Sequence, residues 1–342
     1  MTVTMKKVAR RAGVSISTVS RVLSGHPHVR EELSRKVRRT VKELGYTPNL
    51  VAKSLVTQST RSICVLLPGP SARIFSNLYF MELIRGIAGG AGRLGFEVLL
   101  RSGETEQEEL EAVSGLLKGG RVDGAVLLAS RNNDAVIGYM QNSGYPFVLI
   151  GRSEQYDSIL TVDNNQPAAA CEATQHLISM GHERIGFISG PQENAAMQDR
   201  LKGYRRALRA HGLEYRPDWI IKDEAWEDGG YSSMLSFMKL PERPTALVAA
   251  DDMISFGVIR SLQQLKYAVP GDLAIISCSN VPLSALPVPS ISSIDTGICQ
   301  LGETASRVLI RSIRQPTDGK PVSRRFIVGH RLMVRESTLS GV

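Results

Sequence analysis

Short apolar runs alternate with stretches of helical spacing over most of the chain, from about residue 60 onward. Such runs are typical of strands in a parallel sheet that is covered on both faces. They occupy residues 62–68, 96–100, 122–129, 146–150, 184–189, 246–250 and 273–277. The helical stretches between them include 78–94, 165–180 and 252–266. This alternation predicts an α/β body with parallel sheets.

The body is too long for one sheet of ordinary size. It has roughly 280 residues, so we expect two α/β lobes. In open parallel sheets, ligands bind beyond the carboxyl ends of the strands. We therefore expect a ligand site between the two lobes.

The start of the chain shows helical spacing and no strand-like run. Thr4 and Ser15 are suited to cap helices over 5–12 and 15–23, and Gly13 suits the turn between these helices. The positions expected to face inward are Val8, Ala9, Ala12, Val19, Val22 and Leu23. This is a helix-turn-helix pattern, whose second helix enters the major groove of DNA by its N-terminal end. Two short helices around a glycine also occur in other domains, so the pattern alone leaves both interpretations open.

A third helix is predicted in the segment REELSRKVRRTVKELG, where apolar residues recur at helical spacing before Gly45. Those residues are Leu33, Val37, Val41 and Leu44. The third helix would complete a three-helix head. On the second helix, Ile16, Ser17 and Arg21 would point outward, and Arg21 could make a bidentate contact with guanine.

Charge is unevenly distributed along the chain. Residues 1–60 carry 12 Lys+Arg and 3 Asp+Glu, a net charge of +9, whereas the remaining 282 residues carry 29 and 30, a net charge of −1. A basic head attracts a polyanionic partner, because its side chains release counterions when they neutralise phosphates. The charge therefore favours DNA binding by the head.

Several classes of function lack support in the sequence. There is no P-loop, HExxH or GxSxG motif, and the four cysteines are scattered singly, so we expect no catalysis, metal or cofactor. The glycine-rich segment at 86–92 is interpreted as a packed helix with small residues. No apolar run is long enough to span a bilayer, and the N-terminus lacks the apolar stretch of a signal peptide. We expect a cytoplasmic protein with no membrane partner.

Residues 46–60, YTPNLVAKSLVTQST, contain few core residues. Pro48 and Asn49 could start a helix of about two turns, which is marginal alone in water. DNA could order such a segment, and Leu55 is the kind of apolar wedge that enters a minor groove. A plain linker is the alternative interpretation.

Ordered motifs across essentially the whole chain resemble the lactose-repressor and galactose-repressor family. They are the head, YTPNLVAKSL, HLISMGHERIGFISGP, DRLKGYRRAL, ALVAADDMISFGVIRSL and VPGDLAIISCSN. The resemblance implies a dimeric bacterial transcription regulator whose body is similar to periplasmic sugar-binding proteins. Carried over by position, it implies DNA contacts by Ser15, Ile16, Ser17, Thr18, Arg21, Asn49, Ala52 and Leu55.

The expected fold is a small all-α helix-turn-helix head followed by a two-lobed, periplasmic-binding-protein-like α/β body. The domains would be a DNA-binding domain at 1–47, a hinge at 48–60 and an effector-binding and dimerisation domain at 61–342. The first lobe would comprise about 61–161 and 292–322, and the second about 162–291 and 323–342.

A narrower likeness is to the maltose and α-glucoside regulators of this family. It is carried by LPGPSARIFSNLYFMELIRGI, RVDGAVLLAS, PFVLIGRS and SNVPLSALPVPSISSID. Many relatives have a glycine-aromatic-aspartate-aspartate turn, but this chain has Ser277, Cys278, Ser279 and Asn280, which removes a common acidic sugar ligand. Asparagine at position 280 agrees with the maltose branch. The implied effector is maltose or another α-glucoside.

Sugars bind to aromatic rings and to planar polar groups that match their hydroxyls. The implied effector-binding residues are Phe75, Arg200, Trp226, Asp251 and Asn280. Three of them also have an ordinary structural interpretation. Trp226 could anchor a lobe surface, Arg200 could form a salt bridge, and Asp251 could cap the helix that starts near Met253.

The expected function is repression of a sugar-utilisation operon by a homodimer that binds a palindromic operator and is released by the sugar. Closure of the lobes would change the spacing of the two hinge segments, so that the hinge helices lose their order. One alternative is a regulator that is corepressed by a phosphoprotein or another metabolite. Another is a sugar-binding or sugar-processing protein, against which the charged head and the missing signal peptide argue. The sequence has no heptad tail, which favours a dimer over a tetramer.

Overall fold

The structure of the protein is a computed structural model, in which the described residues are 3–23, 28–47, 59–128, 134–153, 155–156, 158–190, 195–222, 234–235, 237, 239–315 and 325–339. The chain forms two compact units, residues 1–60 and 61–342. Each unit is described by itself.

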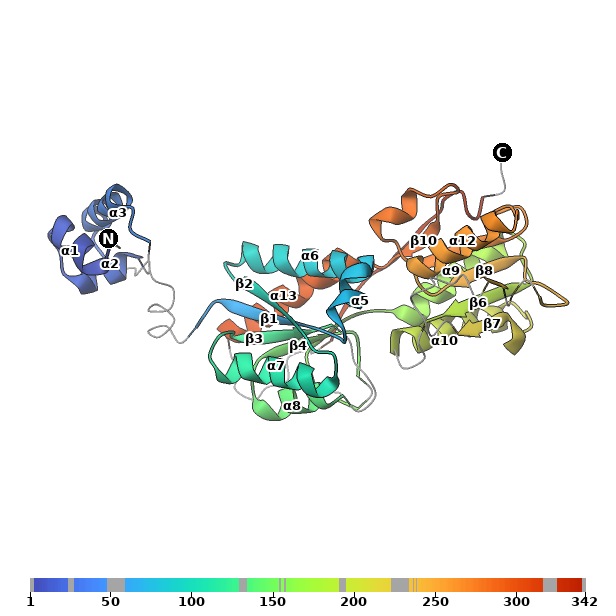
Figure 1. Cartoon of the computed structure of the whole chain (residues 1–342), viewed down its shortest axis with the longest axis horizontal. Helices are drawn as coiled ribbons and strands as arrows, with labels where there is room; N and C mark the ends of the chain where they lie inside the picture. The colour runs from blue at the N-terminus through green and yellow to red at the C-terminus, as the bar shows by residue number, and fades with distance from the viewer. Residues whose placement is uncertain are drawn as a thin grey trace. The chain divides into compact units, whose positions relative to one another are not determined.

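Among the described residues of the first unit, three helices pack together (Figure 1). They are α1 (Met5–Ala12), α2 (Ile16–Leu23) and α3 (Glu31–Leu44). Their apolar faces meet in a core of Val8, Ala9, Ala12, Val19, Val22, Val37 and Tyr46. The predicted three-helix head with a helix-turn-helix is confirmed.

The predicted helix ends of the head are present. Thr4 and Ser15 each accept a hydrogen bond from a backbone N–H in the first turn of their helix, at 3.4 and 3.0 Å. Gly13 and Gly45 follow α1 and α3 with φ of 63° and 61°, a conformation that glycine adopts without steric cost. Local residue chemistry therefore sets the length of these helices.

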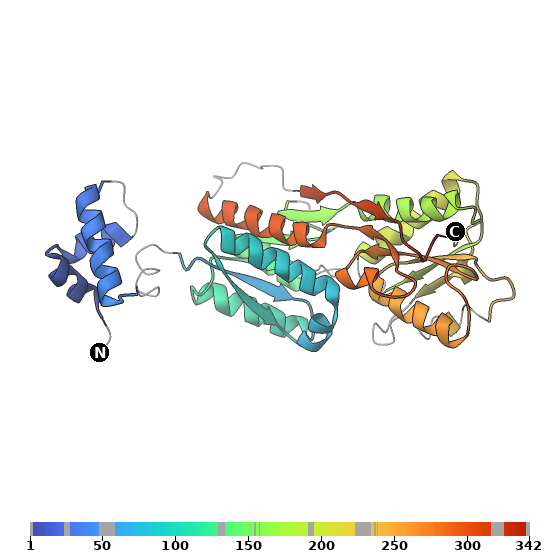
Figure 2. The ribbon, with the colours of Figure 1, turned by 90° about the horizontal axis from the view of Figure 1, so that it is seen from above.

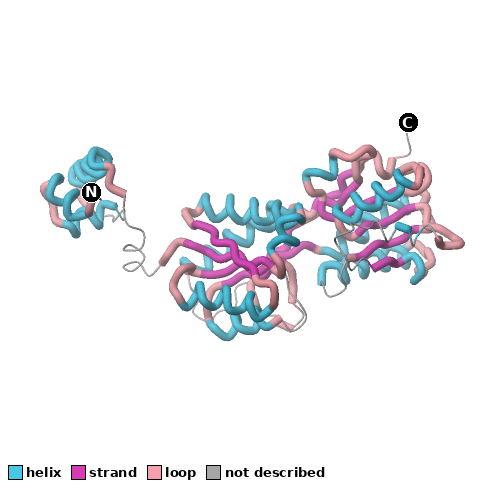
Figure 3. The backbone as a smooth tube through the Cα atoms, in the orientation of Figure 1, coloured by secondary structure: helices cyan, strands magenta, loops and turns pink. Residues whose placement is uncertain are grey.

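Two six-stranded sheets form the second unit, one in each lobe (Figure 3). The first has the order β11-β5-β4-β3-β1-β2, with all neighbours parallel. Its strands are β1 (Ser62–Leu67), β2 (Glu97–Ser102), β3 (Gly124–Leu127), β4 (Phe147–Ile150), β5 (Thr161–Asn164) and β11 (Arg325–Val328). The predicted α/β body with parallel sheets is confirmed.

The second sheet has the order β12-β10-β9-β8-β6-β7. It is parallel except for β12, which pairs with β10 in the antiparallel sense. Its strands are β6 (Ile185–Ser189), β7 (Ile220–Lys222), β8 (Ala246–Ala249), β9 (Ala274–Ser279), β10 (Ser292–Asp295) and β12 (Arg331–Met333).

Helices cover the sheets of both lobes (Figures 1 and 2). The first lobe contains α5 (Ser71–Ser76), α6 (Leu78–Arg93), α7 (Glu106–Lys118), α8 (Ala135–Ser143) and α13 (Ile298–Arg314). The second contains α9 (Gln166–Ser179), α10 (Ala195–Ala210), α12 (Asp252–Gln264) and the 3₁₀ turns η1 (Pro217–Trp219) and η2 (Pro282–Ala285). On β1, Val65 faces the core formed with α6 and α13, whereas Leu66 faces the core formed with α7 and α8. This explains why the strand is apolar throughout.

The glycine-rich segment packs closely against α13, as its interpretation as a packed helix predicts. A Cβ atom at Gly86 would lie 2.1 Å from the carbonyl oxygen of Cys299, and one at Gly90 would lie 2.2 Å from the Ser306 hydroxyl. Any larger side chain at Gly86 would force α6 away from α13. The small residues therefore serve helix packing.

Within the described ranges, the chain crosses between the two sheets three times, after β5, after β10 and after β11. The predicted lobe boundaries at 292 and 323 are wrong in detail, because β10 belongs to the second sheet and β11 to the first. An apolar pattern can reveal a strand, but it does not show which sheet the strand joins. We call the residues around these three passages, 164–166, 295–298 and 328–331, the crossovers.

Candidate functional sites

The N-terminal end of α2 presents a polar, exposed surface. Ile16 has 48% of its surface exposed, although it is a large apolar residue, and Ser17 and Arg21 are also exposed. The hydroxyl oxygen of Ser15 lies 2.7 Å from that of Ser17 and 2.8 Å from that of Thr18. Hydroxyls and an apolar side chain at a helix N-terminus can contact phosphates, base edges and the thymine methyl group.

Not every basic side chain of the head is equally placed for DNA. On α3, Arg39 forms an ion pair with Glu43 at 2.8 Å, and Arg35 lies 3.6 Å from Glu31. On α1, Arg10 and Arg11 lie in the last turn and are exposed. The expected hinge contacts, Asn49, Ala52 and Leu55, lie outside the described residues, as does Trp226.

Asp251 caps a helix in the second lobe, so its structural interpretation is confirmed. Its Oδ1 accepts a hydrogen bond of 2.8 Å from the backbone N–H of Met253, at the start of α12. Only 4% of the residue is exposed. Burial raises the pKa of Asp251 to about 7, and the neighbouring Asp252 adds to this rise, whereas Arg200 opposes it.

Asp252 has a separate set of partners. Its Oδ2 accepts a hydrogen bond of 2.7 Å from Val281 N, and its Oδ1 accepts one of 3.0 Å from the Ser293 hydroxyl. Asp252 therefore holds the turn after β9, while Asp251 caps α12. The two carboxylates bond to different groups and do not form a shared dyad.

Arg200 lies on α10 and is 3% exposed. Its Nε donates a hydrogen bond of 2.8 Å to Oε1 of Gln166, and its Nη1 donates one to the carbonyl oxygen of Ala250. Neither bond uses the outer nitrogen Nη2. The guanidinium is thus held in one orientation beside the carboxylate of Asp251, which it attracts.

Tyr79 is a candidate site residue that the sequence analysis missed. It lies on α6 in the first lobe, and burial raises the pKa of its hydroxyl to about 12. The positive charge of Arg200 opposes that rise, whereas the carboxylates of Asp163 and Asp251 add to it. Tyr79 therefore lies within electrostatic reach of Arg200 and Asp251, which belong to the other lobe. Nothing in the local sequence distinguishes it from a core aromatic residue.

A bidentate ion pair joins the two lobes next to Arg200. Arg152 follows β4 of the first lobe, and its Nε and Nη2 donate to the carboxylate of Asp199 on α10 at 2.5 and 2.7 Å. Lys202 also contacts this carboxylate, at 3.1 Å. Burial alone would raise the pKa of Asp199, but the bonds from Arg152 and Lys202 hold that pKa below its usual value.

The turn after β9 uses Asn280 as a structural residue. Its Oδ1 accepts a hydrogen bond of 2.8 Å from Arg335, and its φ of 57° is unusual for a residue other than glycine. Ser279 has a φ of 134°, and its buried hydroxyl has no partner among the described residues. Phe75 on α5 is 50% exposed. The structure therefore places Arg200 close to Asp251. The amide oxygen of Asn280 is already hydrogen-bonded to Arg335.

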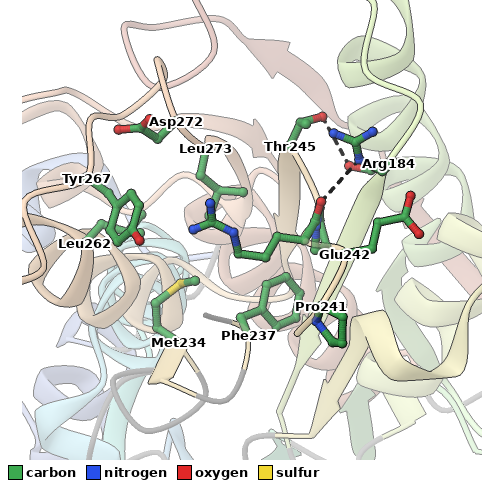
Figure 4. A pocket seen from close by; sticks show the side chains of 12 residues that line it. Arg184, Met234, Phe237, Pro241, Glu242, Thr245, Leu262, Tyr267, Asp272 and Leu273 are labelled. Atoms are coloured by element: carbon green, nitrogen blue, oxygen red, sulfur yellow. Dashed lines mark hydrogen bonds between the residues drawn. The ribbon is translucent and has the colours of Figure 1, made fainter. Parts of the chain in front are cut away.

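A separate pocket of about 350 Å³ lies in the second lobe (Figure 4). Met234, Phe237 and Leu273 contribute its apolar lining, and Arg184 hydrogen-bonds the carbonyl oxygen of Arg243 at its edge. It is located at the amino ends of β6, β8 and β9. Ligands in this architecture bind beyond the carboxyl ends, so this pocket is distinct from the candidate effector site.

The described part of the chain contains no helix that is long and apolar enough to cross a membrane. Over the same residues, no three His, Cys, Asp or Glu side chains gather in a way that could hold a metal ion.

The raised pKa of Asp251 predicts a pH-dependent stability. The folded state binds a proton at this carboxyl between about pH 4 and pH 7, where an unfolded aspartate has lost its proton. The free energy of unfolding should therefore fall as pH rises through that window, by up to about 1.4 kcal/mol per pH unit. Asp251→Asn keeps a cap oxygen but cannot titrate, so it should lack this contribution.

Urea unfolding of both proteins between pH 4.5 and 8 measures the difference in free energy of unfolding. We expect Asp251→Asn to gain stability relative to the wild-type protein as pH rises to about 7, and to gain nothing further above pH 8. Parallel pH profiles for the two proteins would contradict the raised pKa of Asp251.

Comparisons with known proteins cover both units. Residues 4–49 match the family described as bacterial regulatory proteins, lacI family, and residues 174–338 match the periplasmic binding protein-like domain. Catabolite control protein A of Priestia megaterium is 32% identical over 340 residues, which cover 99% of this chain and 100% of the relative. The chain belongs to the LacI family. It is therefore a transcriptional regulator of that family, with a DNA-binding head and a periplasmic-binding-protein-like body, and the relatives named here are regulators, not enzymes.

Two further LacI-family relatives are similar to this chain over nearly its whole length, and one of them was solved with a sugar. The regulator MalR of Streptococcus pneumoniae is 30% identical, over 97% of this chain and 99% of the relative. A solved structure of a transcriptional regulator CelR-cellobiose complex is 30% identical, has a TM-score of 0.75 and covers 98% of this chain and 99% of that chain. The family resemblance is confirmed. Similarity at this level does not select the maltose branch, which stays a prediction.

Proposed function

We propose that this LacI-family protein is a homodimeric repressor of a sugar-utilisation operon, released from a palindromic operator by maltose or another α-glucoside. The observation that carries the proposal is that Arg200 and Asp251, both buried in the second lobe, lie within electrostatic reach of the half-buried Tyr79 of the first lobe. A ligand that contacts residues of both lobes favours one arrangement of the lobes over another.

The chemistry of this group suits a sugar. A carboxylate and a guanidinium pair with vicinal hydroxyls, and the Tyr79 ring offers an apolar face for a pyranose. The hydroxyl of Ser279, at the carboxyl end of β9, has no partner among the residues that the structure describes and is a further candidate partner for a ligand hydroxyl. Phe75 and Trp226 are proposed as additional aromatic contacts. For Asn280 we propose a contact only where the ligand shares it with Arg335.

The choice of an α-glucoside rests on the maltose-branch motifs of the sequence. The CelR relative was solved with cellobiose. Maltose and cellobiose are both disaccharides of glucose that differ in the linkage. A site built from fixed charged groups can discriminate between them, because a misplaced hydroxyl leaves a buried charge unpaired.

Dimer formation is supported by an exposed apolar surface on the body. In the segment after β9, Leu286 is 71% exposed and Val288 is 81% exposed, and Leu283 on η2 is also exposed. Neighbouring apolar side chains in water favour association with a second copy. A two-fold symmetric dimer would place two recognition helices on a palindromic operator.

The test combines a selected operator with a panel of sugars. An operator is obtained by selection from random palindromes, and fluorescence anisotropy then measures DNA affinity with maltose, maltotriose, trehalose, sucrose, cellobiose or glucose. We expect maltose or a related α-glucoside to weaken operator binding at least tenfold. A sugar that strengthens binding would favour the corepressed alternative, and a panel without effect would contradict the proposed effector class.

A further inference from the structure

A buried chain of hydrogen bonds leads from Arg200 to the crossovers. Arg200 Nε donates to Oε1 of Gln166 at 2.8 Å, and Gln166 Nε2 donates to Oδ1 of Asn164 at 3.4 Å. All three side chains are buried. The guanidinium on α10 is therefore connected to the last residue of β5, where the chain first leaves the first lobe.

The amide of Asn164 holds the other two crossovers. Its Nδ2 donates to the carbonyl oxygen of Thr296 at 2.6 Å and to that of Val328 at 3.3 Å. Thr296 follows β10, and Val328 ends β11. One side chain thus joins all three passages between the lobes, although Thr296 and Val328 are 132 and 164 residues away along the chain.

We propose that Gln166 and Asn164 are positioning residues that orient Arg200 and connect it to the hinge between the lobes. This inference rests on the proposed function, in which Arg200 contacts the effector. Rotation of the lobes changes the relative placement of the three crossovers, and so it strains the bonds of Asn164. An effector that fixes Arg200 thereby favours one set of crossover positions.

The side chain at position 166 must do two things at once. It accepts a hydrogen bond from a cation and donates one to an amide oxygen, and the amide of glutamine can do both. A glutamate would accept from Arg200 but has no proton to donate to Asn164. A methionine of similar length would do neither. Gln166→Glu therefore removes only the hydrogen bond to Asn164, whereas Gln166→Met removes the hydrogen bonds to both Arg200 and Asn164.

The first experiment uses maltose as the probe. If another sugar of the panel weakens operator binding more strongly, that sugar replaces maltose. For Gln166→Met we expect sugar affinity, measured by calorimetry, to fall about tenfold, with operator affinity in the absence of sugar within twofold of wild type. For Gln166→Glu we expect sugar affinity within threefold of wild type, but the factor by which saturating sugar weakens operator binding should fall at least fivefold. This split between binding and response would not follow from a loss of stability.

Gln141→Met is the matched control, because Gln141 on α8 donates to Ser158 at 3.0 Å within the first lobe. It should behave as wild type in both measurements. The inference is overturned if Gln166→Glu and Gln166→Met both match this control, or if they only lower the melting temperature. If Gln166→Met fails to fold, Gln166→Glu alone tests the inference. The measured quantity is then the factor by which saturating sugar weakens operator binding.

Hydrogen exchange provides a readout that needs no sugar. Peptides that span 292–301 and 325–333 should exchange at least threefold faster in Gln166→Met, or in Gln166→Glu, than in wild type and in Gln141→Met. Unchanged exchange in these peptides would contradict the connection to the hinge. If wild type binds no sugar of the panel but the exchange result holds, the proposed effector class fails while the link between Gln166 and the crossovers stands.

Discussion

The Arg200→Ala protein is expected to bind its sugar about 1.5 to 3 kcal/mol more weakly than wild type, the usual scale for hydrogen bonds to charged groups. Arg200 is buried, and two of its nitrogens are already held by Gln166 and by the carbonyl oxygen of Ala250. A ligand hydroxyl that loses this donor loses a charged hydrogen-bond partner in a buried site. Operator binding without sugar should stay intact, so the variant should repress without responding to the sugar. Calorimetry with the sugar and anisotropy with the operator measure the two affinities.

Arg206→Ala is the control, because Arg206 is exposed on the same helix. Arg200→Lys keeps the charge but loses the planar fork of donors, so it should also bind sugar poorly if geometry matters. Normal sugar binding by Arg200→Ala would remove Arg200 from the effector site. A joint loss of sugar and operator binding, with a lowered melting temperature, would show a folding defect instead.

The second large effect concerns DNA recognition. Arg21→Ala should cost roughly 1 to 3 kcal/mol on the cognate operator, the range for a bidentate contact to a base, and little on random DNA. Arg21 lies on the exposed side of α2, and its removal leaves the head core of Val19 and Val22 untouched. Anisotropy titrations on both DNA sequences at one salt concentration measure the difference.

Arg35→Ala serves as the comparison for this experiment. Arg35 is a basic residue of α3 that lies near Glu31 on the surface. Its removal should change binding to both DNA sequences by the same small factor, because the loss of one exposed positive charge acts alike on any duplex. Equal losses on cognate and random DNA for Arg21→Ala would exclude Arg21 as a base-reading residue.

The sequence predicted those helices and strands whose ends or burial are set by neighbouring residues in the chain. The helices of the head end where Gly13 and Gly45 permit a left-handed turn, and the central strands of both sheets follow their apolar runs. Strand β10 was missed because two of its three buried residues are polar. Ser292 and Ser293 point into protein and are satisfied there by Thr338 and Asp252. An apolar pattern cannot reveal a strand that is buried through hydroxyl bonds.

The candidate site was predicted in part. Asp251 and Arg200 stand in motifs that carry the family resemblance, and the capping role of Asp251 follows from its place before a helix. The roles of Tyr79, Gln166 and Asn164 depend on partners from other lobes or crossovers. No local pattern marks a residue for a contact that exists only after the distant segments have met.

The discontinuous construction of the lobes has a consequence for the order in which the protein matures. Helix α13 supplies Leu301 and Leu309 to the core of the first lobe, and β11 and β12 add strands to the two sheets. Neither lobe can be completed on the ribosome until this late part of the chain has emerged, whereas the head is synthesised first. A gene interrupted by a stop codon before α13 would thus encode a head with its DNA-reading surface and no finished receptor to control it.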